Sequence, residues 1–389
     1  MNENRVLIFV DWFTPGFRAG GPTRSIANLV GHLKNDLDVF VLTSDTDYRE
    51  SAPYPDLESD RWLYRDGIHV CYLRKSALSK RKIRAFVQEA DAPVWYVNGI
   101  YSRYFSIVPL VLAKSLHPRR VVVAPRGMLS DHALAVKPAR KKLFLTLMKW
   151  AGLYRRVVFQ ATSADECSCI RRRIGAKTPV ELLDNLPCCQ TNKPVAHSAK
   201  QAGKLHLVSA ARVSPEKNTL FALRCLAECH GEIVYDHYGQ FASPEYLKEC
   251  RETIARLPPG IRVNMNGAIA PEELHERLAQ ADFFFLPTTG ENFGHAILES
   301  LQVGIPVIIS DRTPWRDLEK HGVGWDLPLD KGTGTFAAAI DAAVAMGDPE
   351  YRQFAARCRE FAASVGDLQQ LKKRYIAFLT FFAQQEVRA

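Results

Sequence analysis

Several features typical of other protein classes are missing from this 389-residue sequence. No apolar run reaches the length of about 20 residues that a membrane-spanning helix needs, so any membrane contact must be peripheral. None of the nine cysteines belongs to a CxxC pair or to a Cys/His cluster with zinc spacing. Their scatter predicts reduced thiols in a cytosolic protein. We also expect no signal peptide, no repeat of short period and no low-complexity segment.

Positive charge is concentrated in the first half of the chain, within an overall net charge of +9. Residues 1–195 hold 30 Lys/Arg and 18 Asp/Glu, whereas residues 196–389 hold 21 and 24. This excess favours an anionic partner such as a membrane surface or an acidic substrate, and a plain basic surface is an equal alternative. No nucleic-acid module is recognised, and the aromatic interleaving of single-strand binders is absent, so we expect no nucleic-acid partner.

Short apolar runs alternate with helical patterns in two arrays, which predicts an α/β fold with two Rossmann-like βαβ domains. We expect an N-terminal domain of residues 1–190, a linker of 191–203, a C-terminal domain of 204–365, and a final helix of 366–389 packing back toward the N-terminal domain. Ligands of parallel sheets bind outside the carboxyl ends of the strands, so the expected site is a cleft across which the two domains face each other. The expected strands are 5–10, 38–43, 68–73, 94–97, 120–124, 157–161, 204–211, 232–238, 261–265, 282–286 and 306–310.

The segment from Leu286 to Asp311 reads as a strand, a glycine-containing loop, a helix and a further strand. Glu291 lies in the loop, and Glu299 lies two turns further along the helix. Such a loop offers backbone N–H groups and a positive helix end to an anionic or hydroxyl-rich ligand. From these two carboxylates alone, a helix cap at Glu291 and a solvated Glu299 are the simpler explanation.

The order and spacing of these elements resemble the retaining GT-B glycosyltransferases, specifically glycosyltransferase family 4, also called glycosyl transferases group 1. Glu291-Asn-Phe-Gly294, Glu299 and Gly304-Ile-Pro-Val307 match the family's Glu-x-Phe-Gly turn, second Glu and Gly-x-Pro-Val strand. Upstream, the segment 209–218 resembles the family's Gly-Arg-x-x-x-x-Lys motif, with Ala211 in place of the usual glycine.

The resemblance implies a GT-B fold and a retaining hexosyltransferase of polysaccharide biosynthesis. The donor would be a UDP- or GDP-linked sugar, and the acceptor a glycan or a polyprenyl-linked glycan. Arg212 and Lys217 would bind the donor diphosphate, and Glu291 would contact the sugar hydroxyls. No cofactor is implied, and without an Asp-x-Asp motif in a donor-site context no metal is implied either. The further donor-binding residues would be Asn292, Phe293, Gly294, Glu299 for the ribose, and Gly267 beside the nucleobase.

The same resemblance points to strand ends in the N-terminal domain. The glycine pair after the first strand is not the GxGxxG pattern of dinucleotide binding, and a simple tight turn is the alternative. Arg126 stands where many relatives carry His; it cannot act as a base, but it could bind a phosphate or an acidic sugar. His132 is a candidate substitute for that histidine. The expected cleft residues of this domain are Gly20, Gly21, Arg24, Asn98, Arg126 and His132.

Residues 137–156 form a basic amphipathic pattern that could lie on anionic lipid. A core helix with a solvated basic face is an equal alternative, and Lys80–Arg84 is a second basic cluster. A lipid-linked acceptor would fit a cytoplasmic protein that is peripheral on the inner face of the plasma membrane. The expected apolar face consists of Leu143, Phe144, Leu147, Met148 and Ala151, and the expected basic face of Lys142, Lys149 and Arg156.

Two other functions remain open from the sequence. A nucleotide-sugar epimerase could use the same double-Rossmann architecture. The other alternative is a non-catalytic binder, either of sugars, made conceivable by Arg126 in place of the usual histidine, or of nucleic acid, because the first half of the chain is basic.

Overall fold

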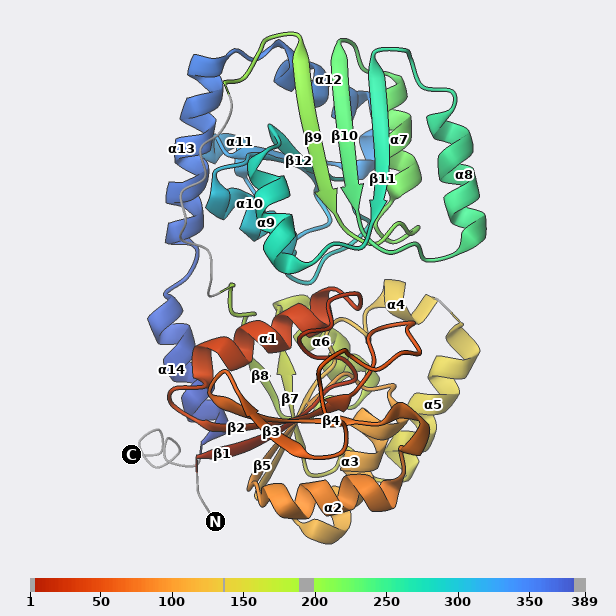
Figure 1. Ribbon diagram of the computed structural model, residues 1–389, viewed down its shortest axis with the longest axis vertical. Helices are drawn as coiled ribbons and strands as arrows, with labels where there is room; N and C mark the ends of the chain where they lie inside the picture. The colour runs from red at the N-terminus through yellow and green to blue at the C-terminus, as the bar shows by residue number, and fades with distance from the viewer. Residues whose placement is uncertain (1–3, 136, 189–198, 381–389) are drawn as a thin grey trace. The chain divides into compact units, whose positions relative to one another are not determined.

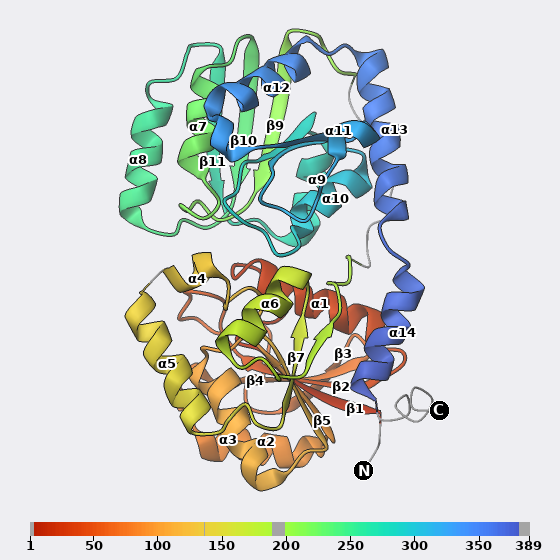
Figure 2. The same ribbon diagram turned by 180° about the vertical axis from the view of Figure 1, so that it is seen from behind.

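The computed structural model describes residues 4–135, 137–188 and 199–380, and the chain divides into two compact units (Figures 1 and 2). Unit 1 comprises Met1–Cys189 and Asp367–Ala389, and unit 2 comprises Gln190–Gly366. Each unit contains one sheet of mainly parallel strands with helices on both faces. The predicted architecture of two Rossmann-like α/β domains is therefore confirmed. Most of the predicted linker, residues 191–198, lies outside the described residues.

Unit 1 is built on an eight-stranded sheet of order β3-β4-β2-β1-β5-β6-β7-β8. The pairing is parallel apart from β3, which runs antiparallel to β4. Neither β3 nor β8 was predicted, because each contains only three or four residues and ends in or is interrupted by a charged side chain. The strands are β1 (Arg5–Phe9), β2 (Asp38–Ser44), β3 (Trp62–Arg65), β4 (Ile68–Leu73), β5 (Val94–Asn98), β6 (Arg120–Ala124), β7 (Val157–Ala161) and β8 (Val180–Leu182).

Two apolar clusters cover the two faces of this sheet, since successive side chains of a strand point to opposite sides. Leu7 and Phe9 face the cluster formed with α2, α3, α5 and α6, whereas Val6 and Ile8 face the cluster formed with α1 and α14. The helices are α1 (Gly21–Leu33), η1 (Lys75–Ala77), α2 (Lys80–Ala90), the π-helical turn η2 (Arg103–Ile107), α3 (Val108–Leu116), α4 (Asp131–Ala135), α5 (Pro138–Trp150), α6 (Ala164–Arg173) and α14 (Leu368–Leu379).

The last helix, α14, packs on unit 1, as expected for the C-terminal segment (Figure 2). Lys372 forms an ion pair with Asp36 at 2.8 Å, and the guanidinium of Arg374 donates to the carbonyl of Leu182 at 2.5 Å. The Tyr375 side chain is buried, and its hydroxyl donates to the carbonyl of Asp184 at 2.9 Å. The end of the chain thus completes the core of the unit with which the chain begins.

Unit 2 contains a six-stranded, fully parallel sheet of order β11-β10-β9-β12-β13-β14. Five of these strands were predicted; β14 is short and was missed. The strands are β9 (Lys204–Ala210), β10 (Glu232–Tyr238), β11 (Ile261–Gly267), β12 (Phe283–Leu286), β13 (Val307–Ser310) and β14 (Gly324–Leu327). The helices are α7 (Thr219–Ala227), α8 (Pro244–Ile254), α9 (Pro271–Ala279), α10 (His295–Val303), α11 (Leu318–His321), η3 (Leu329–Lys331), α12 (Thr333–Ala345) and α13 (Asp348–Ser364).

The core of unit 2 also has two layers. Leu205 and Leu207 of β9 pack with α7 and α12 on one face, and Val208 packs with α9, α10 and α13 on the other. β12 and β13 are buried throughout and read as nearly continuous apolar runs, whereas β10 alternates between buried and partly exposed residues. In its described part, the final helix expected over 366–389 is α14.

The predicted apolar face of α5 is wrong in its composition. Leu145 and Met148 are buried in unit 1, whereas Leu143 and Leu147 are 61% and 53% exposed, and Trp150 is 85% exposed. The helix therefore buries a face rotated away from the one that the sequence pattern indicated. Across the described ranges, no helix is both long enough and apolar enough to span a membrane.

Candidate functional site

The residues predicted to bind a donor gather at the carboxyl edge of the unit 2 sheet. Loops 211–218, 287–294 and 311–317 follow β9, β12 and β13, which are neighbours in the sheet. Since all three strands are parallel, their following loops emerge at the same edge. Residues distant in sequence are thereby brought together in one site.

An ion pair between Lys217 and Glu291 joins the first two loops. The Lys217 ammonium donates a hydrogen bond to Oε1 of Glu291. Only 19% of the Lys217 side chain and 16% of the Glu291 side chain are exposed. Such a pair places one cation and one hydrogen-bond acceptor side by side at the strand ends. A cation can bind a phosphate group, and a carboxylate can accept a hydrogen bond from a hydroxyl group.

Backbone contacts fix the two loops on either side of this pair. The carbonyl of Glu216 accepts hydrogen bonds from the Thr289 amide at 3.0 Å and from the Thr288 hydroxyl at 3.1 Å. Nδ2 of Asn218 donates to the carbonyl of Pro287 at 3.0 Å. Lys217 lies between these two anchored residues, so its position is determined by the loops and not by a helix. The helix that follows, α7, begins only at Thr219.

Arg212 lies at the start of the same loop and is exposed. Burial alone would raise the pKa of Glu216, but a hydrogen bond from Ser214 and the charges of Arg212 and Lys217 hold that pKa below its usual value. The charges of Arg212 and Lys217 contribute to this lowering of the Glu216 pKa, after the hydrogen bonds that the carboxyl accepts. Arg212 and Lys217, the two cations of the motif, thus lie on the one loop after β9.

A buried histidine that the motif did not identify forms a hydrogen bond with the backbone next to Arg212. His237 of β10 is 2% exposed, and its Nε2 donates to the carbonyl of Ala211 at 2.9 Å. Its Nδ1 lies 3.0 Å from the hydroxyl of Tyr235, which can act as the donor to that nitrogen. Burial lowers the pKa of His237 to about 4, so the ring is neutral at pH 7. The alternation of β10 was the one available signal that this residue faces inward.

The Asn292-Phe293-Gly294 turn is locked in place by the loop after β13. The indole Nε1 of Trp315 donates to the carbonyl of Phe293 at 2.5 Å, and the Glu291 amide donates to the carbonyl of Arg312 at 3.0 Å. Gly294 caps α10 with a φ of +78°, and a Cβ there would lie 2.8 Å from Cδ1 of Ile297. The glycine is required by both its backbone conformation and its surroundings.

Glu299 and Gly267 occupy different environments. Glu299 is 5% exposed in α10, so the alternative of a solvated carboxylate on the helix surface is wrong. Gly267 ends β11, and its carbonyl accepts a hydrogen bond from the Gly239 amide at 2.6 Å. Because Gly239 follows β10, this bond links the loops at the β10 and β11 end of the edge.

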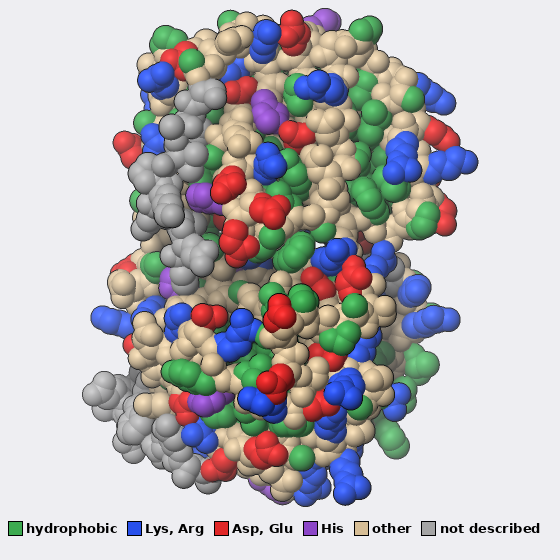
Figure 3. All heavy atoms as spheres, viewed as in Figure 1, with side chains coloured by type: hydrophobic (Ala, Val, Ile, Leu, Met, Phe, Trp, Pro, Cys, Tyr) green, Lys and Arg blue, Asp and Glu red, His purple; other side chains and the backbone are tan. Residues whose placement is uncertain are grey.

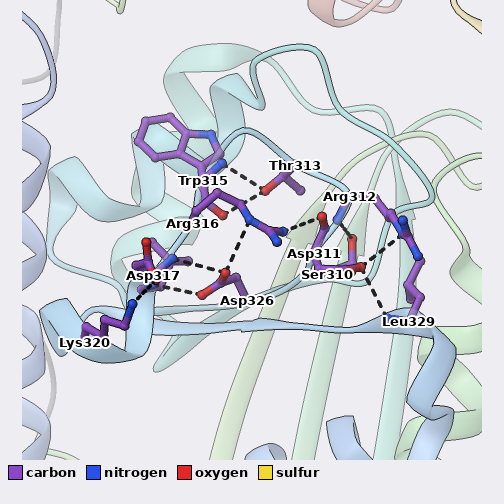
Figure 4. A network of polar contacts seen from close by, with 11 residues as sticks. Ser310, Asp311, Arg312, Thr313, Trp315, Arg316, Asp317, Lys320, Asp326 and Leu329 are labelled. Atoms are coloured by element: carbon purple, nitrogen blue, oxygen red, sulfur yellow. Dashed lines mark hydrogen bonds and ion pairs between the residues drawn. The ribbon is translucent and has the colours of Figure 1, made fainter. Parts of the chain in front are cut away.

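A further polar network, missed by sequence reasoning, follows β13 (Figure 4). Asp326 accepts hydrogen bonds from the amides of Asp317 at 3.2 Å and Leu318 at 2.9 Å. The guanidinium of Arg316 lies 3.8 Å from the Asp326 carboxylate and donates to the carbonyl of Asp311. The network holds the loop that carries Trp315 and therefore supports the Phe293 turn indirectly.

In unit 1, the glycine pair lies at the start of α1. Gly20 has a φ of +73° and is the residue before the helix, Gly21 is its first residue, and the Arg24 amide donates to the carbonyl of Gly20 at 3.1 Å. A Cβ at either glycine would meet no atom within 4 Å. The space around this turn is therefore open at the carboxyl end of β1.

Arg126 and Asn98 are brought together, but the arrangement points to a structural role. The Arg126 guanidinium donates to Oδ1 of Asn98 at 2.9 Å, to Oδ1 of Asn185 at 2.5 Å and to the hydroxyl of Tyr96 at 2.7 Å. These bonds use three of the five N–H donors of the guanidinium and hold it against unit 1. The expected contact with a phosphate or an acidic sugar stays a prediction. His132 lies in α4, and its side chain is outside what the structure describes.

Asp11 is a second site candidate that the sequence did not reveal. It lies two residues after the end of β1, and its Oδ1 accepts a hydrogen bond from the Ser102 hydroxyl at 2.6 Å. Burial raises the pKa of this carboxyl to about 6, against the opposing effect of the Ser102 bond. An acidic residue directly after the first buried strand was the signal available. Within residues 4–135, 137–188 and 199–380, no three His, Cys, Asp or Glu side chains group to hold a metal ion.

Comparison with known proteins agrees with this geometry. Residues 192–361, which hold all of the unit 2 candidates, match the profile of the family described as glycosyl transferases group 1. No match was found among curated protein sequences.

Solved structures are similar over nearly the whole chain. HepE of Anabaena, in complex with UDP and glucose, is 16% identical, with a TM-score of 0.71 over 96% of this chain and 99% of that one. Sucrose-phosphate synthase of Thermosynechococcus elongatus is 16% identical, with a TM-score of 0.64 over 96% and 97%. WaaG, a glycosyltransferase involved in lipopolysaccharide biosynthesis, is 12% identical, with a TM-score of 0.61 over 97% and 100%. At these identities the likeness establishes the fold, which is GT-B.

Proposed function

We propose that this chain, whose residues 192–361 belong to the glycosyl transferases group 1 family and which has the GT-B fold, is a retaining hexosyltransferase. It transfers a hexosyl unit from a nucleotide diphosphate sugar to a glycan or lipid-linked glycan. The observation that carries the proposal is the Lys217–Glu291 ion pair, preformed at the carboxyl edge of the unit 2 sheet.

In the proposed mechanism, Lys217 and Arg212 bind the donor diphosphate. Their charges stabilise the negative charge that grows on the leaving phosphate as the bond between it and the anomeric carbon breaks. Lys217 then exchanges its contact with Glu291 for one with phosphate. Glu291 is released to accept hydrogen bonds from the sugar hydroxyls.

The acceptor hydroxyl attacks the same face of the sugar from which the nucleotide departs, which gives retention. Its oxygen forms the new bond to the anomeric carbon, and its proton passes to the departing phosphate oxygen. No protein base is needed for this transfer. Retention would be seen directly as an unchanged anomeric configuration in the NMR spectrum of the product.

Two cations in one loop can also replace a metal ion at the diphosphate, so we propose metal-independent transfer without a cofactor. Activity should persist in EDTA. If EDTA abolished transfer and Mg²⁺ or Mn²⁺ restored it, the assignment of this role to Arg212 and Lys217 would fail.

The donor is proposed to be UDP-linked, with GDP as the other candidate, because the similar HepE structure holds UDP and glucose. We propose an acceptor in polysaccharide biosynthesis, glycan or polyprenyl-linked, at the cytoplasmic face of the membrane; the similarity to WaaG supports a role of this kind. Thermal-shift titration with UDP, GDP and ADP and their sugars would identify the base.

The decisive test is the loss of transfer in Lys217→Ala and Glu291→Ala, each expected to lower kcat by about 10²–10³-fold. The matched control is Lys248→Ala and Glu252→Ala, an exposed ion pair of the same residue types on α8. The double variant Lys217→Ala/Glu291→Ala removes both charges and separates lost chemistry from instability caused by one unpaired charge. Near wild-type rates in both single variants would remove the site assignment.

The remaining alternatives give different products. A nucleotide-sugar epimerase would change the donor sugar in the absence of any acceptor. A non-catalytic binder would shift its melting temperature with a nucleotide sugar but release no nucleotide. Chromatography of the reaction with and without acceptor distinguishes all three.

A further inference from the structure

The exposed side of α5 is the most apolar surface that unit 1 leaves uncovered on a single helix. Leu143, Leu147 and Trp150 are 61%, 53% and 85% exposed and lie at spacings of four and three residues. At about 100° per residue, all three fall within a stripe roughly 60° wide. Isolated exposed apolar residues are common, but an aligned set that includes an almost fully exposed Trp indicates a contact surface.

Folding of unit 1 does not account for this stripe. The opposite side of α5 provides the core contacts: Leu145 and Met148 are buried, and the Phe144 ring packs against Tyr101 with centroids 5.1 Å apart. The helix is thus held by one face. Polar residues at the three outward positions would leave those core contacts intact.

The positive charge around the stripe indicates an anionic partner. Residues 132–164 contain seven Lys and Arg and no Asp or Glu. Arg140 lies on one side of the stripe, Lys142 and Lys149 lie on the other, and all three are exposed. Figure 3 shows hydrophobic side chains at the right-hand margin of unit 1, where α5 lies, with Lys and Arg side chains beside them.

We propose that this face of α5 binds an anionic lipid surface. Leu143, Leu147 and Trp150 enter the headgroup region, where Trp partitions favourably, and the flanking cations pair with lipid phosphates. A second copy of the same face is a poor partner, because it would oppose one acid-free basic surface to another. The surface would bring unit 1 to a lipid-linked acceptor. This last step rests on the proposed function, whereas the lipid binding itself does not.

The test measures co-sedimentation of the full chain with vesicles of phosphatidylcholine, alone or mixed with phosphatidylglycerol. We expect binding to the mixed vesicles at low salt and weaker binding at high salt. The variant Leu143→Ser/Leu147→Ser/Trp150→Ser should bind more than tenfold more weakly. The variant Arg140→Gln/Lys142→Gln/Lys149→Gln should lose about fivefold per cation removed.

The matched control is Lys80→Gln/Arg81→Gln/Arg84→Gln, which removes the same charge from exposed positions of α2. The inference is overturned if the wild type does not bind mixed vesicles at low salt, or if the α2 control weakens binding as much as the α5 variant. Two further outcomes would overturn it by indicating another partner. The apolar variant could convert a dimer to a monomer in sedimentation velocity without losing vesicle binding, or it could lose DNA retention instead of vesicle binding.

Nucleotide release with a water-soluble acceptor is measured on the same variants. Because all six α5 side chains are exposed, these variants should retain that activity and the wild-type melting temperature. Retained release with lost vesicle binding supports the membrane surface. Absent release in the wild type together with normal vesicle binding would contradict the proposed function and leave this surface standing.

Discussion

At the scale of single residues, Arg126 shows that a side chain at the carboxyl edge of a parallel sheet can make several buried contacts within its own unit. Sequence reasoning identified it because it follows a buried strand and replaces a histidine common in relatives. Its guanidinium instead satisfies Tyr96, Asn98 and Asn185, the last two being 4% and 7% exposed. No sequence pattern could reveal these partners, since they come from loops and strands far apart in the chain.

Replacing Arg126 with Ala should therefore destabilise unit 1 by about 2–4 kcal/mol, because three buried polar groups lose a charged donor. Nucleotide binding by unit 2 should be unchanged. Urea unfolding and UDP titration measure the two effects, with Arg84→Ala on the surface of α2 as control. Lost activity with unchanged stability would instead indicate that Arg126 contacts a substrate.

His237 predicts a pH dependence of stability. The unfolded histidine binds a proton near its ordinary pKa of 6.5, whereas the buried one does so only near 4. The unfolded state is thus favoured by protonation between these values, so this contribution is fully present above pH 6.5 and is lost as the pH falls toward 4. The difference amounts to about 3 kcal/mol for a shift of this size.

The measurement is the free energy of unfolding of the wild type and of His237→Gln between pH 7.5 and pH 4.5. The variant should be less stable at pH 7.5, and the gap between the two proteins should narrow on acidification. A gap independent of pH would show that His237 does not titrate as its burial requires.

At the scale of elements, the sequence located most strands of both sheets, because central parallel strands such as β5, β12 and β13 are buried throughout and rich in apolar residues. It failed where local pattern and tertiary contact disagree. Short segments such as β14 become strands because they pair with a neighbouring strand. Here Gly324 of β14 pairs in register with Val307 of β13. The buried face of α5 was misjudged because leucine occurs on all sides of that helix, and only packing decides which leucines are covered.

The candidate site was predicted at the same scale, through motif spacing, and its residues in unit 2 do gather at one edge. What the spacing could not supply is the support for these residues. Thr288, His237 and the Arg316 network hold the loops through contacts between segments far apart in sequence. Such contacts follow from sheet order, which the sequence does not encode locally.

Gly294 offers a test of loop geometry at this scale. Gly294→Ala would place a Cβ 2.8 Å from Ile297 at a φ of +78°, at a cost of about 1–3 kcal/mol, and would displace the turn after Glu291. We expect lower kcat with a modest loss of stability. Gly334→Ala in α12 is the control, because its nearest atom would be 3.7 Å away. Equal effects of the two substitutions would refute the geometric explanation.

At the scale of the whole molecule, the two compact units do not correspond to two continuous stretches of sequence. α14 follows unit 2 in sequence but belongs to unit 1, where Tyr375 and Leu379 are each 1% exposed in the core beside α1. The chain therefore passes between the units twice. A substitution in α14 is therefore a perturbation of unit 1 and not of unit 2.

Tyr375→Ala tests the role of α14. The substitution removes a buried ring and the hydroxyl that accepts from Nε2 of Gln160 at 2.6 Å and donates to Asp184. A cavity and a lost hydrogen bond should together cost unit 1 about 3–5 kcal/mol. Tyr375→Phe, which keeps the ring, should cost only about 1–2 kcal/mol.

Hydrogen exchange resolved by segment locates these effects. In Tyr375→Ala, protection should fall in β1, β2 and α1 of unit 1, while β9, β12 and β13 of unit 2 keep theirs and UDP binding is retained. Loss of protection in both units would mean that α14 stabilises the molecule as a whole and not the unit on which it packs. Equal costs for the Ala and Phe variants would assign the effect to the hydroxyl network alone, because the ring contributes through the volume that it fills in the core.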